Sequence, residues 1–293
     1  MYPSISTSYL KEWDPYAMVQ CFAGQGWQSL ELHDIHGYAL LSGRDPERVG
    51  LAFKRFAADH GVSFPQGHLY VARRDVETGE TVWFDIAPAD DQAFAGALDE
   101  IKRWIDFFNA LGIKAGVLHP GGSTLEQNGW SPERILERRV EALQAIADHA
   151  EGGPTVVCLE NLAEYGIPTV EGLLQVILLV GSDRLGICLD TGHAHLSGAD
   201  IPAFIAEAGS RLRALHIGDN GGRTDDHLLP YGYGTIEWEP VLQALRAVGY
   251  PGPLNLEIPG ENKCPKPIRL AKLKYALELA ERMIALSAGL ASE

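Results

Sequence analysis

Six segments of this chain end an apolar, strand-like run in residues that could bind a metal ion. The segments are PQGHLY, GVLHPGG, TVVCLENL, GICLDTGHAH, ALHIGDN and LNLEIPG, and the residues are His68, His119, Glu160, Asp190 with His193, His216 and Glu257. A seventh segment, TDDHLLPYGYG, adds Asp225 and His227 on a loop. The pattern predicts parallel strands whose carboxyl ends converge on one cation site.

The set Glu160, Asp190, His216 and Glu257 carries most of this argument. Three carboxylates gathered at one site would repel each other and stay partly protonated unless a cation neutralised them. The histidine adds a neutral nitrogen donor, and oxygen and nitrogen ligands without a thiolate suit Mn²⁺, Zn²⁺, Co²⁺ or Mg²⁺. A single histidine at a strand end is usually a hydrogen-bonded core or rim residue. Coincidence at four strands is improbable, so the metal site is the better interpretation.

The remaining candidates have weaker signals. Asp190 and His193 are spaced i, i+3, and a tight turn containing Gly192 could aim both at one cavity. Asp225 and His227 could belong to an ordinary solvated turn, but their glycine-rich surroundings favour a functional loop, because barrel enzymes place substrate contacts on such loops.

The chain alternates strand and helix signals throughout its length. The expected strands are residues 5–9, 28–33, 62–68, 115–119, 155–160, 185–190, 212–216 and 254–258. The expected helices are residues 14–23, 46–60, 90–111, 132–150, 169–179, 201–208, 239–248 and 268–286, with a loop or hairpin inserted at 73–87 that turns at Thr78-Gly79. Eightfold alternation predicts a (β/α)8 TIM barrel, a single domain over residues 1–293, with the metal site at the C-terminal face of the strands.

Composition narrows the functional classes. The chain has 293 residues, is 46% hydrophobic and carries a formal net charge of −15, which disfavours a broad nucleic-acid-binding surface. The four cysteines are widely spaced, and Cys158 and Cys188 lie in apolar runs typical of buried free thiols. Neither a secretory signal nor a bilayer-spanning apolar run is recognisable, so we expect a cytoplasmic protein without membrane contact.

The segments that carry the candidate ligands resemble those of the xylose isomerase-like TIM barrel superfamily, which contains sugar isomerases and epimerases together with endonuclease IV. The resemblance covers nearly the whole chain. It implies that Glu160, Asp190, His216 and Glu257 hold one divalent metal, and that His193 contacts substrate. Such barrels often form dimers or tetramers, so a homo-oligomer would be consistent with the resemblance.

Endonuclease IV-type enzymes use a trinuclear zinc site, and its additional ligands match His68, His119, Asp225 and His227. The segment HLLPYGYGTIEW resembles the corresponding segment of the sugar isomerases and epimerases more than that of the nuclease. Asp226 stands where the nuclease loop has an arginine. An acidic residue there is a poor neighbour for phosphodiester DNA. The second glutamate of ketose 3-epimerases is not matched, since Gly166 occupies its place.

The resemblance therefore implies a sugar, sugar-phosphate or polyol isomerase or epimerase that acts through a metal-stabilised enediolate. Glu160 and Glu257 would be the catalytic acid and base, one metal ion is expected, and up to three could bind. His193, Arg223 and Trp27 are predicted to contact a small carbohydrate substrate, with a core or rim role as the alternative for the tryptophan. The alternative function is a zinc phosphodiesterase of the endonuclease IV type with a trinuclear site.

Overall fold

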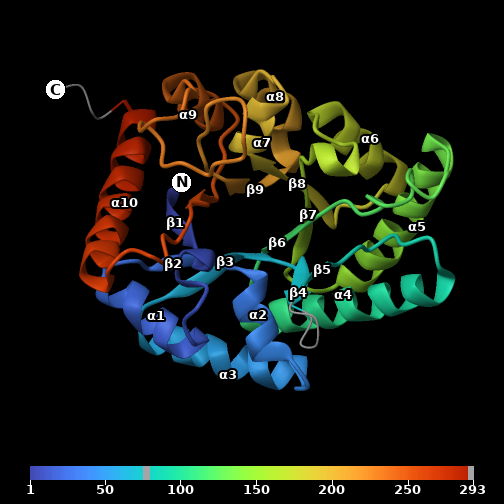
Figure 1. Cartoon of the computed structure of the whole chain (residues 1–293), viewed down its shortest axis with the longest axis horizontal. Coiled ribbons are helices and arrows are strands. Elements are labelled where there is room, and N and C mark those ends of the chain that lie inside the picture. The colour runs from blue at the N-terminus through green and yellow to red at the C-terminus, as the bar shows by residue number, and fades with distance from the viewer. Residues whose placement is uncertain (75–79, 290–293) are drawn as a thin grey trace.

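The computed structural model describes residues 1–74 and 80–289, and its strands form a ring enclosed by helices (Figure 1). Eight parallel strands pair in the order β10-β1-β2-β3-β6-β7-β8-β9. Their bounds are β1 Tyr2–Ser6, β2 Ser29–Leu32, β3 Ser63–His68, β6 Ala115–Leu118, β7 Val156–Glu160, β8 Leu185–Asp190, β9 Leu212–His216 and β10 Pro253–Leu256. Backbone hydrogen bonds of Ile217 with Asn255 and Glu257 join β9 to β10 and close the barrel.

Helices follow the strands and pack around the ring (Figure 1). They are α1 Pro15–Gly24, α2 Asp34–Leu41, α3 Pro46–Asp59, α4 Asp91–Leu111, α5 Pro132–Ala150, α6 Val170–Val180, α7 Thr191–Leu196, α8 Ile201–Ala208, α9 Trp238–Ala247 and α10 Lys266–Ser287. Three of these helices begin at a side-chain cap: Asp45, Asp90 and Ser131 each accept a backbone N–H group from the first turn of α3, α4 and α5, respectively. The predicted (β/α)8 barrel is confirmed.

The structure corrects three local expectations. The first strand lies earlier than residues 5–9, because Thr7–Leu10 form a 3₁₀ turn that Ser6 caps. The tight turn expected around Gly192 is helix α7, which Asp190 caps. Helix α2 was not predicted: its glycine weakens the helical signal, yet a Cβ at Gly37 would lie 2.5 Å from the Trp104 ring, so only glycine permits this packing.

The insertion after β3 is a hairpin, as expected. β4 (Ala72–Arg74) pairs antiparallel with β5 (Thr81–Trp83). The predicted Thr78-Gly79 turn lies outside the described residues. The hairpin leaves the barrel directly beyond the end of β3, on the side where His68 stands.

The barrel interior is sealed by small apolar side chains. Ala115, Val117, Cys158, Cys188 and Ala214 form one buried cluster contributed by four neighbouring strands. Both cysteines in it are free thiols, as expected. The barrel is therefore a packed core rather than a channel.

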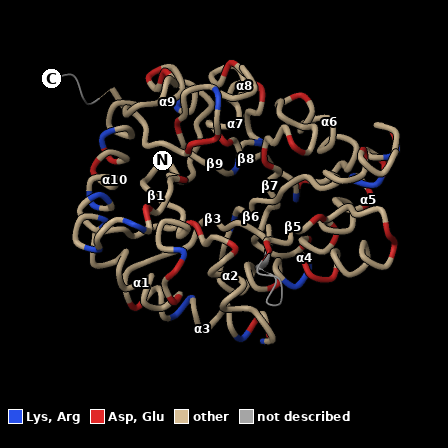
Figure 2. Tube along the Cα trace, in the orientation of Figure 1, with Lys and Arg blue, Asp and Glu red and all other residues tan. Residues whose placement is uncertain are grey.

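Charged residues are spread over the outer helices, with Lys and Arg interspersed among Asp and Glu (Figure 2). Over residues 1–74 and 80–289, every helix is too short or too polar to cross a bilayer.

Candidate metal centre

The alternation of strands places the predicted ligands in one layer of the barrel. Side chains two positions apart on a strand point to the same side. Glu160, Asp190 and His216 each follow by two positions a member of the buried interior cluster, namely Cys158, Cys188 and Ala214. The same spacing relates His119 to Val117. The ligand candidates therefore stand one layer above the apolar floor, at the C-terminal mouth.

Glu160 is the hub of this layer. Its Oε2 atom lies 3.4 Å from Nε2 of His68 and 3.5 Å from Nε2 of His119. Its Oε1 atom lies 3.3 Å from Nδ1 of His193 and 3.3 Å from Nδ1 of His216. One carboxylate thus faces four imidazoles from four different parts of the chain.

The candidate residues form three groups, and within each group the ligand atoms lie within 4.8 Å of one another. The groups are Glu160, Asp190, His216 and Glu257; His68, His119 and Glu160; and His193, Asp225 and His227. Two donors bound to one ion at roughly 2.1 Å can be at most about 4.2 Å apart, so small side-chain shifts would suffice for coordination. Every predicted ligand belongs to one of these groups.

Asp225 joins the two histidines of the group His193, Asp225 and His227. Its Oδ2 atom lies 3.3 Å from Nε2 of His193 and 3.0 Å from Nε2 of His227. His227 adopts a left-handed backbone with φ 47°, which costs a non-glycine residue on the order of 1 kcal/mol. Strain of this kind is characteristic of functional loops.

Unpartnered polar atoms test whether the residues fit a metal ion. Among the described residues, nine buried side-chain polar atoms lack a hydrogen-bond partner, and they include Oε2 of Glu160, Oδ2 of Asp190 and Nδ1 of His193. Leaving such atoms unsatisfied is costly. All three belong to the candidate groups, and their oxygen and nitrogen chemistry suits a divalent cation.

The histidines are also held as metal ligands usually are, with the second ring nitrogen bound to protein. Nδ1 of His68 lies 3.0 Å from the carbonyl of Leu69, and Nδ1 of His119 lies 3.2 Å from the hydroxyl of Tyr165. Nδ1 of His227 lies 3.2 Å from the carbonyl of Glu257. These contacts orient Nε2 of each ring toward its group.

The candidate ligands differ in solvent exposure, and they divide into a buried set and a partly exposed rim. The side chains of Glu160, Asp190 and His216 are at most 3% exposed. Those of His227 and Asp225 are 29% and 40% exposed, and that of Glu257 is 15% exposed. A substrate would therefore reach Glu257 and the rim residues before Glu160.

Electrostatics explain how the apposed carboxylates coexist in the absence of an ion. Burial raises the pKa of Glu160, but the surrounding histidines, led by His216, outweigh it and hold that pKa well below its usual range. Burial lowers the pKa of His193, but neighbouring carboxylates, first Asp190, raise it to about 12. Burial, aided by Glu160 and Glu257, raises the pKa of Asp190 to about 6. Protons on histidine thus supply positive charge that a bound cation would replace.

One carboxylate beneath the candidate ligands was not predicted from the sequence. Glu31 on β2 is fully buried, and its Oε1 atom lies 2.8 Å from Nε2 of His216. Burial raises the pKa of Glu31, but His216 outweighs this and lowers it to about 2. The signal available in the sequence was an acidic residue inside the apolar strand SLEL.

Two predicted substrate contacts differ in outcome. Trp27 is 1% exposed, and its Nε1 atom donates to the carbonyl of Leu273 on α10, so it is a core residue and the prediction of a substrate wall is wrong. Arg223 is exposed on the loop that carries Asp225, which leaves its predicted role as a proposal.

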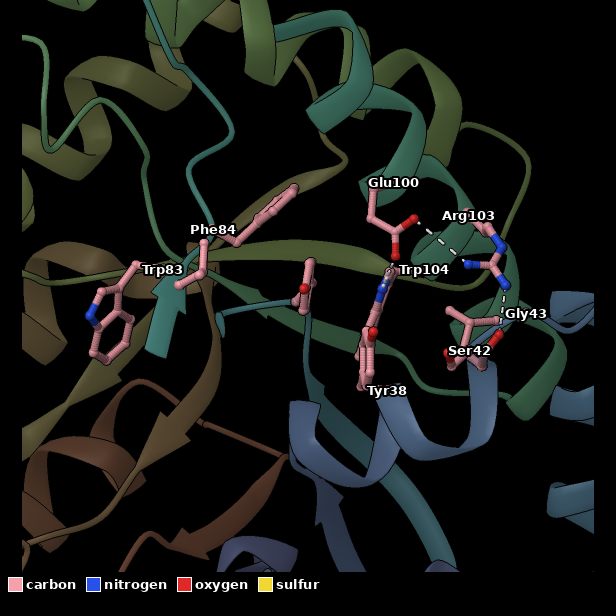
Figure 3. Close-up of a pocket in the computed structure, with 11 residues that line it drawn as sticks. Tyr38, Ser42, Gly43, Trp83, Phe84, Glu100, Arg103 and Trp104 are labelled. Carbon is pink, nitrogen blue, oxygen red and sulfur yellow. Dashed lines mark hydrogen bonds and ion pairs between the residues drawn. The ribbon is translucent and has the colours of Figure 1, made fainter. Parts of the chain in front are cut away.

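A separate cavity of about 430 Å³ lies between α2, α4 and the β4–β5 hairpin (Figure 3). Three of its polar side chains are already engaged within the lining: Nε1 of Trp104 donates to Glu100, and Arg103 donates to the carbonyl of Leu41. The candidate ligands do not line it. The chemistry of the centre, rather than cavity size, therefore identifies the functional site.

Known proteins share this barrel fold. The family model described as xylose isomerase-like TIM barrel matches residues 24–283, and the chain belongs to this family. The solved structure of a D-psicose 3-epimerase in the presence of D-fructose superposes with a TM-score of 0.79 at 18% identity, covering 97% of this chain and 99% of that chain. The IOLI protein with a zinc atom superposes with a TM-score of 0.74 at 18% identity over the full length of both chains.

Curated relatives belong to different functional groups. The chain is 24% identical to an inosose isomerase of Bacillus velezensis over 79% of this chain and 82% of that protein. It is 42% identical to the uncharacterized protein y4fM of Sinorhizobium fredii over 54% of this chain and 51% of that protein. It is 31% identical to a probable endonuclease 4 of Mycoplasmoides gallisepticum over 52% of each. The chain thus spans about half the length of the latter two relatives.

Proposed function

We propose that this chain is a divalent-metal-dependent isomerase or epimerase of a sugar or a similar polyhydroxylated carbonyl compound. The observation that carries the proposal is the group Glu160, Asp190, His216 and Glu257, whose ligand atoms lie within 4.8 Å of one another at the barrel mouth. The inosose isomerase, which matches over 79% of this chain, supports the same class of substrate.

The chain's own residues would divide the work. Glu257 is the more accessible of the two catalytic carboxylates, with 15% of its side chain exposed against 3% for Glu160, so we assign it the removal of the proton next to the carbonyl. Glu160 would serve the opposite face of the substrate. His193, held between Glu160 and Asp225, would orient a substrate hydroxyl. A divalent ion held by the four residues would supply Lewis acidity that stabilises the developing enediolate charge.

Deuterium exchange tests this proposal without knowledge of the product. Zinc-, manganese- or cobalt-loaded protein is incubated with a panel of ketoses, aldoses and inososes in D₂O, and proton NMR follows the carbon next to the carbonyl. We expect exchange with at least one compound for the wild type and none for Glu257→Gln. Equal exchange by both proteins would contradict the assignment of Glu257.

One observation favours a second candidate function. The other two groups, His68 with His119 and Glu160, and His193 with Asp225 and His227, supply enough ligands for further ions. Such a set fits a phosphodiesterase of the endonuclease IV type. Zinc-dependent cleavage of bis(p-nitrophenyl) phosphate and abasic-site DNA, together with no deuterium exchange across the sugar panel, would select this function instead.

A further inference from the structure

Glu31 binds three side chains from three other strands. Its Oε1 atom accepts from Nε2 of His216 at 2.8 Å and from Nε2 of Gln66 at 3.1 Å. Its Oε2 atom accepts from Nδ2 of Asn255 at 2.6 Å. The carboxylate is fully buried on β2 and points to the underside of the candidate metal ring.

We infer that Glu31 is a positioning residue that fixes the orientation and the proton of His216, so that Nδ1 is presented to the metal. An ionised carboxylate only accepts hydrogen bonds, so the short contact requires a proton on Nε2. The opposite nitrogen, Nδ1, then faces Oε1 of Glu160 at 3.3 Å and Oε2 of Glu257 at 3.2 Å. The inference rests on the metal site of the proposed function.

A purely structural role explains Glu31 less well. Gln66 already ties β3 to β9 without it, because its amide donates to the carbonyl of Leu215 and accepts from the N–H of the same residue. A buried charge is costly, and a well-packed apolar residue would close the barrel at lower cost. A hydrogen bond from the imidazole to this carboxylate has a functional effect, because it increases the electron donation of the metal-bound nitrogen.

Two amide side chains hold the Glu31 carboxylate in place. Gln66 and Asn255 stand two positions before His68 and Glu257 on their strands, so both amides lie on the inner side, one layer below the ring. They supply the other two hydrogen bonds of the carboxylate. Glu31 is thereby fixed against rotation, and it can fix the ring of His216 in turn.

The test uses the full-length protein, ¹⁵N-labelled at histidine and titrated with ¹¹³Cd²⁺. Wild type, Glu31→Gln and Glu31→Leu are compared, and Thr155→Val is the control because Thr155 is equally buried and its hydroxyl binds only the carbonyl of Ile113. NMR reports the coupling between cadmium and Nδ1 of His216 and the tautomer of that ring. Chelator competition gives the affinity, and thermal unfolding of the metal-free proteins gives their stability.

We expect Glu31→Gln and Glu31→Leu to lose roughly 10–100-fold in affinity and to show mixed His216 tautomers, while Thr155→Val binds like the wild type. Wild-type affinity and tautomer in both Glu31 variants would overturn the positioning role alone. Absence of the cadmium coupling in the wild type would overturn the metal site itself, and this role with it. Should Glu31→Leu not fold, the near-isosteric Glu31→Gln decides.

Discussion

Nδ1 of His216 lies 3.3 Å from Oε1 of Glu160, although the two residues are 56 positions apart in the sequence. They stand at the ends of β7 and β9, with β8 and its terminal Asp190 between them. Parallel pairing brings these strand ends side by side, because Glu160 pairs with Cys188, two positions before Asp190, and Asp190 pairs with His216. The barrel therefore brings the ligand set together through strand register rather than through loop conformation.

Replacing Glu257 by Gln should reduce kcat by about 10²–10⁴-fold, because a neutral amide cannot accept the proton that the reaction removes. The near-isosteric amide should leave the fold intact. Glu281→Gln, at an exposed position of α10, is the matched control and should keep full activity. Steady-state kinetics on a substrate found by deuterium exchange is the measurement. A Glu257→Gln enzyme with more than a tenth of wild-type kcat would argue against a role in proton transfer.

The outer histidines separate the two candidate functions. Under the isomerase proposal His227 contacts substrate, so His227→Asn should raise KM about tenfold, equivalent to about 1.4 kcal/mol of binding, without changing the metal content. The comparison requires kinetics and elemental analysis on the same preparation. Loss of a bound ion in this variant would instead support the multinuclear hydrolase.

Gly37 should tolerate no larger side chain. In Gly37→Ala the new methyl would meet the buried Trp104 ring at 2.5 Å, so we expect a loss of about 1–3 kcal/mol in the free energy of unfolding. Gly24→Ala is the control, because its Cβ, at the end of α1, would meet no atom of residues 1–74 or 80–289 within 4 Å. Helix propensity should stabilise that variant by up to about 1 kcal/mol. Equal denaturant midpoints for the two variants would contradict the packing argument.

His36 should make the stability of the protein depend on pH. Burial, followed by the charge of His33, lowers the pKa of His36 to about 4, while its Nδ1 atom lies 3.0 Å from the Thr7 hydroxyl. Between an unfolded pKa of about 6.5 and this folded value, only the unfolded chain takes up the proton, so stability falls as pH falls. The contribution is fully present above this window.

Urea unfolding of chelator-treated protein from pH 7 to 4.5 measures the effect. The wild type should lose roughly 2 kcal/mol more than His36→Asn across this interval, because the variant has no imidazole to titrate at this position. Parallel pH profiles for the two proteins would show that the buried imidazole is not responsible.

Much of this arrangement could be predicted from the sequence, since apolar runs ending in ligand residues specify both the strands and the face of the barrel. Glu160, Asp190, His216 and Glu257 do lie together. Trp27 could not be placed, because an aromatic side chain suits a helix interface as well as a substrate wall. Glu31 was missed because its partners come from three other strands, and only the closed barrel brings them together.

The most direct test of the central claim is the metal content per chain of protein purified without chelator, with anomalous scattering to locate each ion. We expect one divalent ion held by Glu160, Asp190, His216 and Glu257, and its loss in Asp190→Asn. Three zinc ions that also reach His68, His119, Asp225 and His227 would favour the hydrolase instead. No ion at the four residues, even after supplementation with Zn²⁺, Mn²⁺, Co²⁺ or Mg²⁺, would contradict the proposed metal site.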